Sequence, residues 1–255
     1  MVSLMKASPR ATPRLFLILA ALATATMTAA AQDAVVMKSG LTREGKITGV
    51  SGANLRLQVQ GGGATGIPLA EIREIRMDAP PEFEAAASRL ASNDAAGAVA
   101  ALQTINDTYA GLPAPWAQRA AALLGDAKLA AGDQEGAAAA YEKLIQTYPE
   151  ATALANLGRA RLAVEGGRFD QASPLLEPLL AASDQTAFPA PSDAAALCQA
   201  HLLTGRVQEA AGDHQAALAS YLKASALFPF DKNAATDAQK RADALRAEHA
   251  GLIAP

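Results

Sequence analysis

The stretch Ala131–Glu150 reads AGDQEGAAAAYEKLIQTYPE, and eighty residues later Ala211–Phe230 reads AGDHQAALASYLKASALFPF. The two stretches are identical at 8 of 20 positions, and five of these identities (Gly, Asp, Tyr, Lys and Pro) are not alanine. In a chain this rich in alanine, only those five are evidence of duplication. Duplication on this scale indicates repeated units that stack on one another.

The segment 82–250 reads as alternating helices that end at Gly-Asp, Gly-Gly or Pro. We expect helix pairs at 82–92 with 94–110, 114–131 with 133–147, 150–165 with 168–182 and 192–211 with 213–227, then a last helix at 231–249. The second helices begin after Asn93-Asp94, Gly132-Asp133, Gly167-Arg168 and Gly212-Asp213. Glycine favours the end of one helix and aspartate caps the next, so each pair should be antiparallel. Pro174 and Pro178 predict an irregular second helix in the third pair.

The helix pairs resemble tetratricopeptide repeats, whose pattern is W-x2-L-G-x2-Y in the first helix and A-x3-F-x2-A with a late Pro in the second. The matching residues are Leu124-Gly125, Ala137, Tyr141 and Pro149 in the second pair, Leu157-Gly158 and Ala172 in the third, and Gly205, Ala217, Tyr221, Ala224 and Pro229 in the fourth. The chain departs from the pattern at the early Trp, which His201 replaces in the fourth pair, and at Leu144. The first pair matches least. The alternative is an unrelated alanine-rich helical bundle.

Residues 34–78 show a different, two-residue periodicity. Short apolar runs at 34–38, 44–50, 54–59, 67–69 and 72–77 alternate with glycine-rich turns and predict five strands. Five short strands protect their edges best by closing on themselves, so the sequence predicts a small β-barrel. The order of parts resembles SH3-like or Sm-like barrels, in which a short helical turn precedes the last strand, here at Leu69–Ile72. A docking or capping module is the plain interpretation, because the segment lacks a basic cluster with aromatics for RNA.

The N-terminus resembles a bacterial secretory signal peptide. Lys6, Arg10 and Arg14 precede the apolar run LFLILAALA at 15–23, and Ala29-Ala30-Ala31 fits a cleavage site. We therefore expect residues 1–31 to be removed and the protein to be periplasmic or secreted, without a stable membrane span. The alternative is an uncleaved anchor, although 17 residues at 15–31 are short for a bilayer span.

The whole pattern predicts an α+β multidomain chain, with a five-stranded β-barrel at 34–78 and an all-α helical-repeat solenoid at 82–250. Net charge is +2 over residues 34–78 and −7 over 79–255, which does not suggest a nucleic-acid binder. Cys198 is the single cysteine. With His201 three residues away and His214 in the next predicted helix, it offers thin evidence for a metal site, and a buried, hydrogen-bonded His201 is the favoured interpretation. No catalytic motif is present, so no enzyme, cofactor or metal is expected.

A binding surface remains as the functional expectation. The first helices of tetratricopeptide repeats line a groove, and the resemblance places Arg119 and Asp126, Asn156 and Arg159, and Gln199 and Arg206 on it. The leading hypothesis is an exported scaffold that binds a protein or peptide of the cell envelope, with the barrel as a second docking module. The alternatives are an envelope-organising or self-assembling protein, and a metal- or small-ligand-binding protein. The oligomeric state is not predicted.

Overall fold

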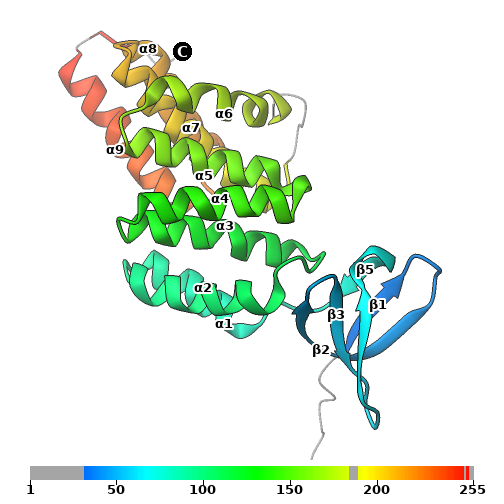
Figure 1. The fold of residues 1–255 in the computed structure, drawn as a ribbon. Helices are drawn as coiled ribbons and strands as arrows, with labels where there is room; N and C mark the ends of the chain where they lie inside the picture. Colours follow the sequence, from blue (N-terminus) through cyan, green and yellow to red (C-terminus); the bar gives the residue numbers. More distant parts are fainter. Residues whose placement is uncertain (1–31, 184–188, 250, 253–255) are drawn as a thin grey trace, which may run out of the picture. The chain divides into compact units, whose positions relative to one another are not determined.

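The computed structural model describes residues 32–183, 189–249 and 251–252 (Figure 1). The predicted signal peptide, residues 1–31, lies outside the described residues. Strands come first: β1 (Asp33–Met37), β2 (Thr42–Ser51), β3 (Asn54–Gln58), β4 (Ala64–Pro68), the 3-10 turn η1 (Leu69–Glu71) and β5 (Ile72–Arg76). Helices follow: α1 (Pro81–Ala91), α2 (Ala95–Tyr109), α3 (Pro115–Ala130), α4 (Gln134–Thr147), the 3-10 turn η2 (Pro149–Ala151), α5 (Thr152–Glu165), α6 (Phe169–Ser183), α7 (Pro191–Ala210), α8 (His214–Leu222), the π-turn η3 (Lys223–Leu227) and α9 (Lys232–Glu248).

The five strands form an antiparallel sheet in the order β4-β3-β2-β1-β5. The long strand β2 pairs with β1 through its first half and with β3 through its second half. Alternation along the strands buries Ile47, Leu55, Leu57 and Ile67, as the two-residue periodicity predicts. The α+β class, the five strands and the short turn before the last strand are thus confirmed.

The fourth strand was the least accurate of the predicted strands. The structure begins β4 at Ala64, three residues before the predicted start at 67. Residues 64–66 read Ala-Thr-Gly and show no apolar alternation, yet their backbones pair with Gln58, Leu57 and Arg56 of β3. Backbone pairing with β3 therefore determines where β4 begins, and this pairing produces no pattern of apolar side chains that the sequence could reveal.

The turns between paired helices use the predicted residues. Asn93, Gly132, Gly167 and Gly212 all have positive φ, between 64° and 83°, which ends the preceding helix. Asp133 then accepts a hydrogen bond from the Gly136 N–H at 2.8 Å, and Asp94 and Asp213 cap their helices in the same way. Apart from α8, which ends at Leu222 where 227 was expected, the α-helices begin and end within about two residues of the predicted bounds. They stack in chain order (Figure 1).

Two predictions about the helices are corrected. Helix α6 is continuous through Pro174 and Pro178, although irregularity was expected. Both prolines are exposed and four residues apart, so they share the solvent-facing side, where water satisfies the carbonyls that lose a partner. The last turn of the second helix of the fourth pair widens into the π-turn η3, closed by a hydrogen bond from the Phe228 N–H to the Lys223 carbonyl. Pro229 disfavours helical backbone at the residue before it, so the helix ends there.

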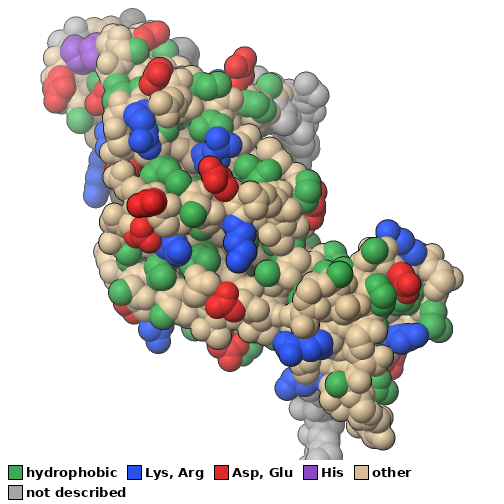
Figure 2. Space-filling model, in the orientation of Figure 1, with side chains coloured by type: hydrophobic (Ala, Val, Ile, Leu, Met, Phe, Trp, Pro, Cys, Tyr) green, Lys and Arg blue, Asp and Glu red, His purple; other side chains and the backbone are tan. Residues whose placement is uncertain are grey.

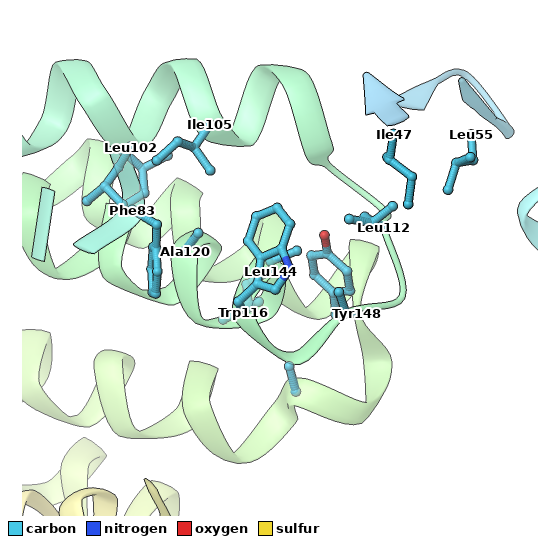
Figure 3. Packing of buried hydrophobic residues seen from close by; sticks show 14 of the residues in the cluster. Ile47, Leu55, Phe83, Leu102, Ile105, Leu112, Trp116, Ala120, Leu144 and Tyr148 are labelled. Atoms are coloured by element: carbon cyan, nitrogen blue, oxygen red, sulfur yellow. The ribbon is translucent and has the colours of Figure 1, made fainter. Parts of the chain in front are cut away.

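The largest buried cluster contains side chains from the sheet and from the helices α1 to α5 (Figure 3). Trp116 is buried in it with its ring edge against Tyr109, at 5.2 Å between ring centroids. Tyr148 is also buried, and its hydroxyl accepts a hydrogen bond from the Gly111 N–H at 2.9 Å. Within the described part of the chain, no helix is long and apolar enough to cross a membrane.

Candidate functional site

A pocket of about 560 Å³ lies among α3, α5 and α7, the first helices of the second, third and fourth pairs. Its walls carry Leu123, Leu154 and Leu179, which are half-buried, and the more deeply buried Leu157 and Leu197. The volume falls in the range of pockets that take small ligands or inserted side chains. The half-buried leucines, which belong to α3, α5 and α6, leave apolar surface for an occupant to cover.

Three polar side chains that line the pocket, Asp126, Arg161 and Gln199, are bonded to one another. Arg161 of α5 forms an ion pair with Asp126 of α3, and both side chains are 23% exposed. The same guanidinium donates to the side-chain carbonyl of Gln199 on α7. Burial by itself lowers the pKa of Arg161, but Asp126 and the nearby Tyr141 raise it, so its net pKa lies above the ordinary value. Arg161 therefore stays charged and links three repeats.

Tyr141 explains how the local sequence builds this arrangement. Its ring is fully buried and lies against Gly125 of α3 and Gly158 of α5, where an added Cβ would overlap the ring. A buried hydroxyl needs a partner, and Tyr141 donates to the Asp126 carboxylate at 2.7 Å. Burial and the negative charge of Asp126 raise the pKa of Tyr141 well above its ordinary range. The repeat-defining residues thus position the carboxylate that holds Arg161.

The chain of contacts continues from Gln199 toward the end of the molecule. The side-chain N–H of Gln199 donates to the carboxylate of Asp231 at 2.5 Å. Asp231 is the N-cap of α9 and accepts from the backbone N–H groups of Asn233 and Ala234. A continuous path of polar contacts therefore runs from Asp126 beside the pocket to the start of α9.

The structure brings together three of the six residues predicted for the groove. Arg119, Asp126 and Gln199 line the pocket. Arg119 is exposed, and its guanidinium lies over the Phe83 ring at 5.6 Å from the centroid. A binding role for these residues stays a prediction.

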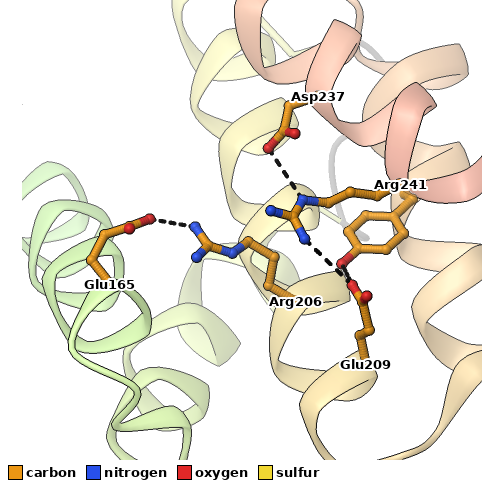
Figure 4. A network of polar contacts seen from close by, with 6 residues as sticks. Glu165, Arg206, Glu209, Asp237 and Arg241 are labelled. Carbon is orange, nitrogen blue, oxygen red and sulfur yellow. Dashed lines mark hydrogen bonds and ion pairs between the residues drawn. The ribbon is translucent and has the colours of Figure 1, made fainter. Parts of the chain in front are cut away.

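The other three predicted residues lie outside the pocket lining. Asn156 is half-buried and Arg159 is exposed. Arg206 forms an ion pair with Glu165, which joins α7 to α5 (Figure 4). The repeat pattern gave their place along each helix but not which side of α5 or α7 faces the opening.

Arg161 was missed by the sequence analysis, and a signal for it exists. It follows Tyr141 by twenty residues, and Arg241 follows Tyr221 by the same interval. In the second case Tyr221 donates to Glu209. Arg241 contacts both Glu209, at 3.6 Å, and Asp237, at 3.3 Å, and these two contacts are drawn in Figure 4. A tyrosine, a carboxylate and an arginine of the next unit therefore recur at two junctions.

The residues considered for a metal site do not come together. Cys198 is fully buried, and its thiol donates to the carbonyls of Ala224 and Asp231. His201 is buried and stacks on Phe228, whereas the His214 ring stacks on His249, at 3.9 Å between centroids. Among the described residues no group of three or more His, Cys, Asp or Glu side chains is placed to hold a metal ion. On the face drawn in Figure 2, basic and acidic side chains both occur.

Comparison with known proteins adds one match. The family model described as tetratricopeptide repeat matches residues 122–151. These residues run from the middle of α3 through α4 to the end of η2, which is the pair that holds Tyr141. The search of curated proteins found no match for the chain. The matched segment and the helical repeat region around it together support a tetratricopeptide-repeat protein.

Proposed function

We propose that this protein is a non-enzymatic scaffold that binds a segment of a partner protein in the pocket among α3, α5 and α7. The observation that carries the proposal is the apolar wall of leucines that three successive repeats contribute: the half-buried Leu123 of α3 and Leu154 of α5, and the more deeply buried Leu197 of α7. Tetratricopeptide repeats serve in general as protein-interaction modules, and the match at 122–151 supports that general role. An inserted apolar side chain would cover the half-buried leucines, each of which would then contribute at most about half of the ~1.5–3 kcal/mol of a leucine buried from full exposure.

The polar chemistry of the pocket favours binding over catalysis. Asp126 is engaged by Tyr141 and Arg161, and Gln199 is engaged on both sides of its amide. A general base or nucleophile needs a lone pair directed at substrate, whereas these groups are directed at one another. They give the pocket a fixed shape, which lowers the entropic cost of binding.

The proposal extends to the setting of the protein. Its support is the sequence: the N-terminal segment resembles a signal peptide, so we propose export and a partner in the cell envelope. The β-domain, residues 34–78, would serve as a second docking module, since its strands β4 and β5 present the two edges of the sheet.

Site-specific photocrosslinking tests the pocket. A photoreactive phenylalanine analogue would replace Leu123, which lines the pocket, and in a matched variant Leu129, which is half-buried on the same helix but does not line it. Irradiation in cells should give a discrete crosslinked protein from position 123 and at least fivefold less from position 129. Melting curves of both variants check that folding is retained. No crosslink at 123, or equal yields at both positions, would contradict the proposal.

A further inference from the structure

We propose that helix α9 regulates the pocket: docked α9 holds Gln199 and Arg161 in their binding positions, and the pocket and α9 respond to each other through these two side chains. The biological use of this coupling rests on the proposed function. The coupling itself is a property of the isolated chain and is argued from its contacts alone.

Asp231 ties the two regions together because one carboxylate serves both. One of its oxygens accepts the N–H groups of Asn233 and Ala234, at 3.1 and 3.0 Å, and so caps α9. The other oxygen accepts the side chain of Gln199 at 2.5 Å. When the start of α9 moves away, Gln199 loses this acceptor, and its carbonyl is then no longer fixed beneath Arg161.

The packing of α9 makes such movement possible. Its buried face consists of Ala234, Ala238, Ala242 and Leu245. Alanine buries little area, so hydrophobic contact holds this helix less firmly than a leucine-rich face would. Its docking therefore depends strongly on its polar contacts, of which Asp231 with Gln199 is the one that reaches the pocket.

Cys198 is a natural reporter of α9 docking. It is the chain's only cysteine, it is fully buried, and it belongs to the cluster that contains Ala234 and Ala238. Its thiol donates to the Asp231 carbonyl at 3.7 Å. Burial, more than the nearby charge of Asp231, raises the pKa of Cys198 to about 11, so the docked thiol is doubly protected. Undocking of α9 removes one of the elements that cover this thiol, so it should speed the reaction of Cys198 with a thiol reagent.

The test measures how fast 5,5′-dithiobis(2-nitrobenzoate) modifies Cys198 at pH 8 in the isolated protein. Asp126→Asn, three contacts away from Asp231, should accelerate modification about five- to tenfold, within the usual range of coupling between sites. Glu165→Gln is the matched control: it removes the carboxylate of the other ion pair between neighbouring first helices, with Arg206, which does not lead to Asp231. It should change the rate less than about twofold.

A double-mutant cycle separates coupling from general loosening. Gln199→Leu removes the side chain that connects Arg161 to Asp231. The double variant Asp126→Asn/Gln199→Leu should therefore be modified at Cys198 within about twofold of the rate of Gln199→Leu alone. Urea unfolding of all variants shows how much of each rate comes from global opening. The proposal is overturned by equal acceleration in Asp126→Asn and Glu165→Gln, by no acceleration in Asp126→Asn, or by rates that multiply in the double variant.

A reciprocal experiment links the coupling to the proposed function. Asp231→Ala lies outside the pocket lining and should still reduce the crosslink from position 123 several-fold. The thiol assay contains no partner, so its failure leaves the crosslinking result standing. Conversely, absence of a crosslink from position 123 with intact thiol coupling would remove the proposed function and leave α9 coupled to the pocket.

Discussion

The second and fourth helix pairs carry the same tyrosine, eighty residues apart, in different surroundings. Tyr141 lies against glycines of two repeats, Gly125 and Gly158, whereas Gly205 alone among the described glycines approaches Tyr221 in this way. Asp126 and Arg161 around Tyr141 are each 23% exposed, but Glu209 and Arg241 around Tyr221 are 36% and 34% exposed. We call each group of tyrosine, carboxylate and arginine a joint. The joint of Tyr141, Asp126 and Arg161 is interior, whereas the joint of Tyr221, Glu209 and Arg241 is half-exposed and involves the last described helix.

This difference shows what stacking adds to a repeat. Residue type and position are shared by the two pairs, so the tyrosine is buried in both. The neighbour on the far side differs: α5 is a full repeat helix with a glycine at the contact, whereas α9 is the last described helix and presents alanines. We expect the interior joint to matter more for stability, and the predictions below follow from that expectation.

The largest effect should come from removing the rings. Tyr141→Ala and Tyr221→Ala each leave a buried cavity and should lower the free energy of unfolding by about 3–5 kcal/mol. Tyr141→Ala should lie at the upper end, because its cavity separates two repeats and the Asp126 carboxylate loses the hydrogen bond from the phenol. Urea denaturation monitored by circular dichroism measures both. A larger loss in Tyr221→Ala would contradict the distinction between interior and terminal joints.

The carboxylates should separate the joints more clearly. Asp126→Ala leaves a mostly buried Arg161 without its carboxylate partner and should cost about 2–3 kcal/mol. Glu209→Ala leaves Arg241 paired with Asp237 in a more exposed place, where screening by water reduces the cost to about 1 kcal/mol or less. Equal losses in urea unfolding at low salt would show that exposure does not set the strength of these joints.

Alkaline pH should weaken both joints by a smaller, defined amount. Burial raises the pKa of Tyr141 and of Tyr221 above the ordinary value, and the adjacent carboxylates raise it further. Below about pH 10 the unfolded chain keeps both phenols protonated, so the two tyrosines contribute their whole stabilisation to the folded state. Above that pH the unfolded state ionises first, so each tyrosine should lower the free energy of unfolding by about 1.4 kcal/mol per pH unit.

Phenylalanine variants check this pH dependence. Tyr141→Phe and Tyr221→Phe should each reduce the slope of unfolding free energy against pH, between about pH 10 and 11.5, by the contribution of one tyrosine. Urea titrations at several pH values give that slope. An unchanged slope in either variant would mean that its phenol ionises equally well in the folded state.

The sequence by itself determined the helices, their turns and the repeat, because these depend on neighbours a few residues apart. Gly132-Asp133 and Gly212-Asp213 mark turns through backbone freedom and capping, and alternation around Leu55 and Leu57 marks a strand. The sequence did not predict the regular helix through Pro174 and Pro178, which is possible because both prolines face solvent. Nor did it predict the early start of β4, which depends on backbone pairing with β3.

Only the tertiary structure decided the site. Asn156, Arg159 and Arg206 have the residue types of a groove but lie outside the pocket lining, whereas Arg161, which sequence analysis missed, belongs to that lining. The reason is physical: a small rotation of a helix moves a side chain from one face to another, and side-chain packing between repeats fixes that rotation. The path from Asp126 to Asp231 joins residues more than a hundred positions apart, and such contacts exist only once the repeats have stacked.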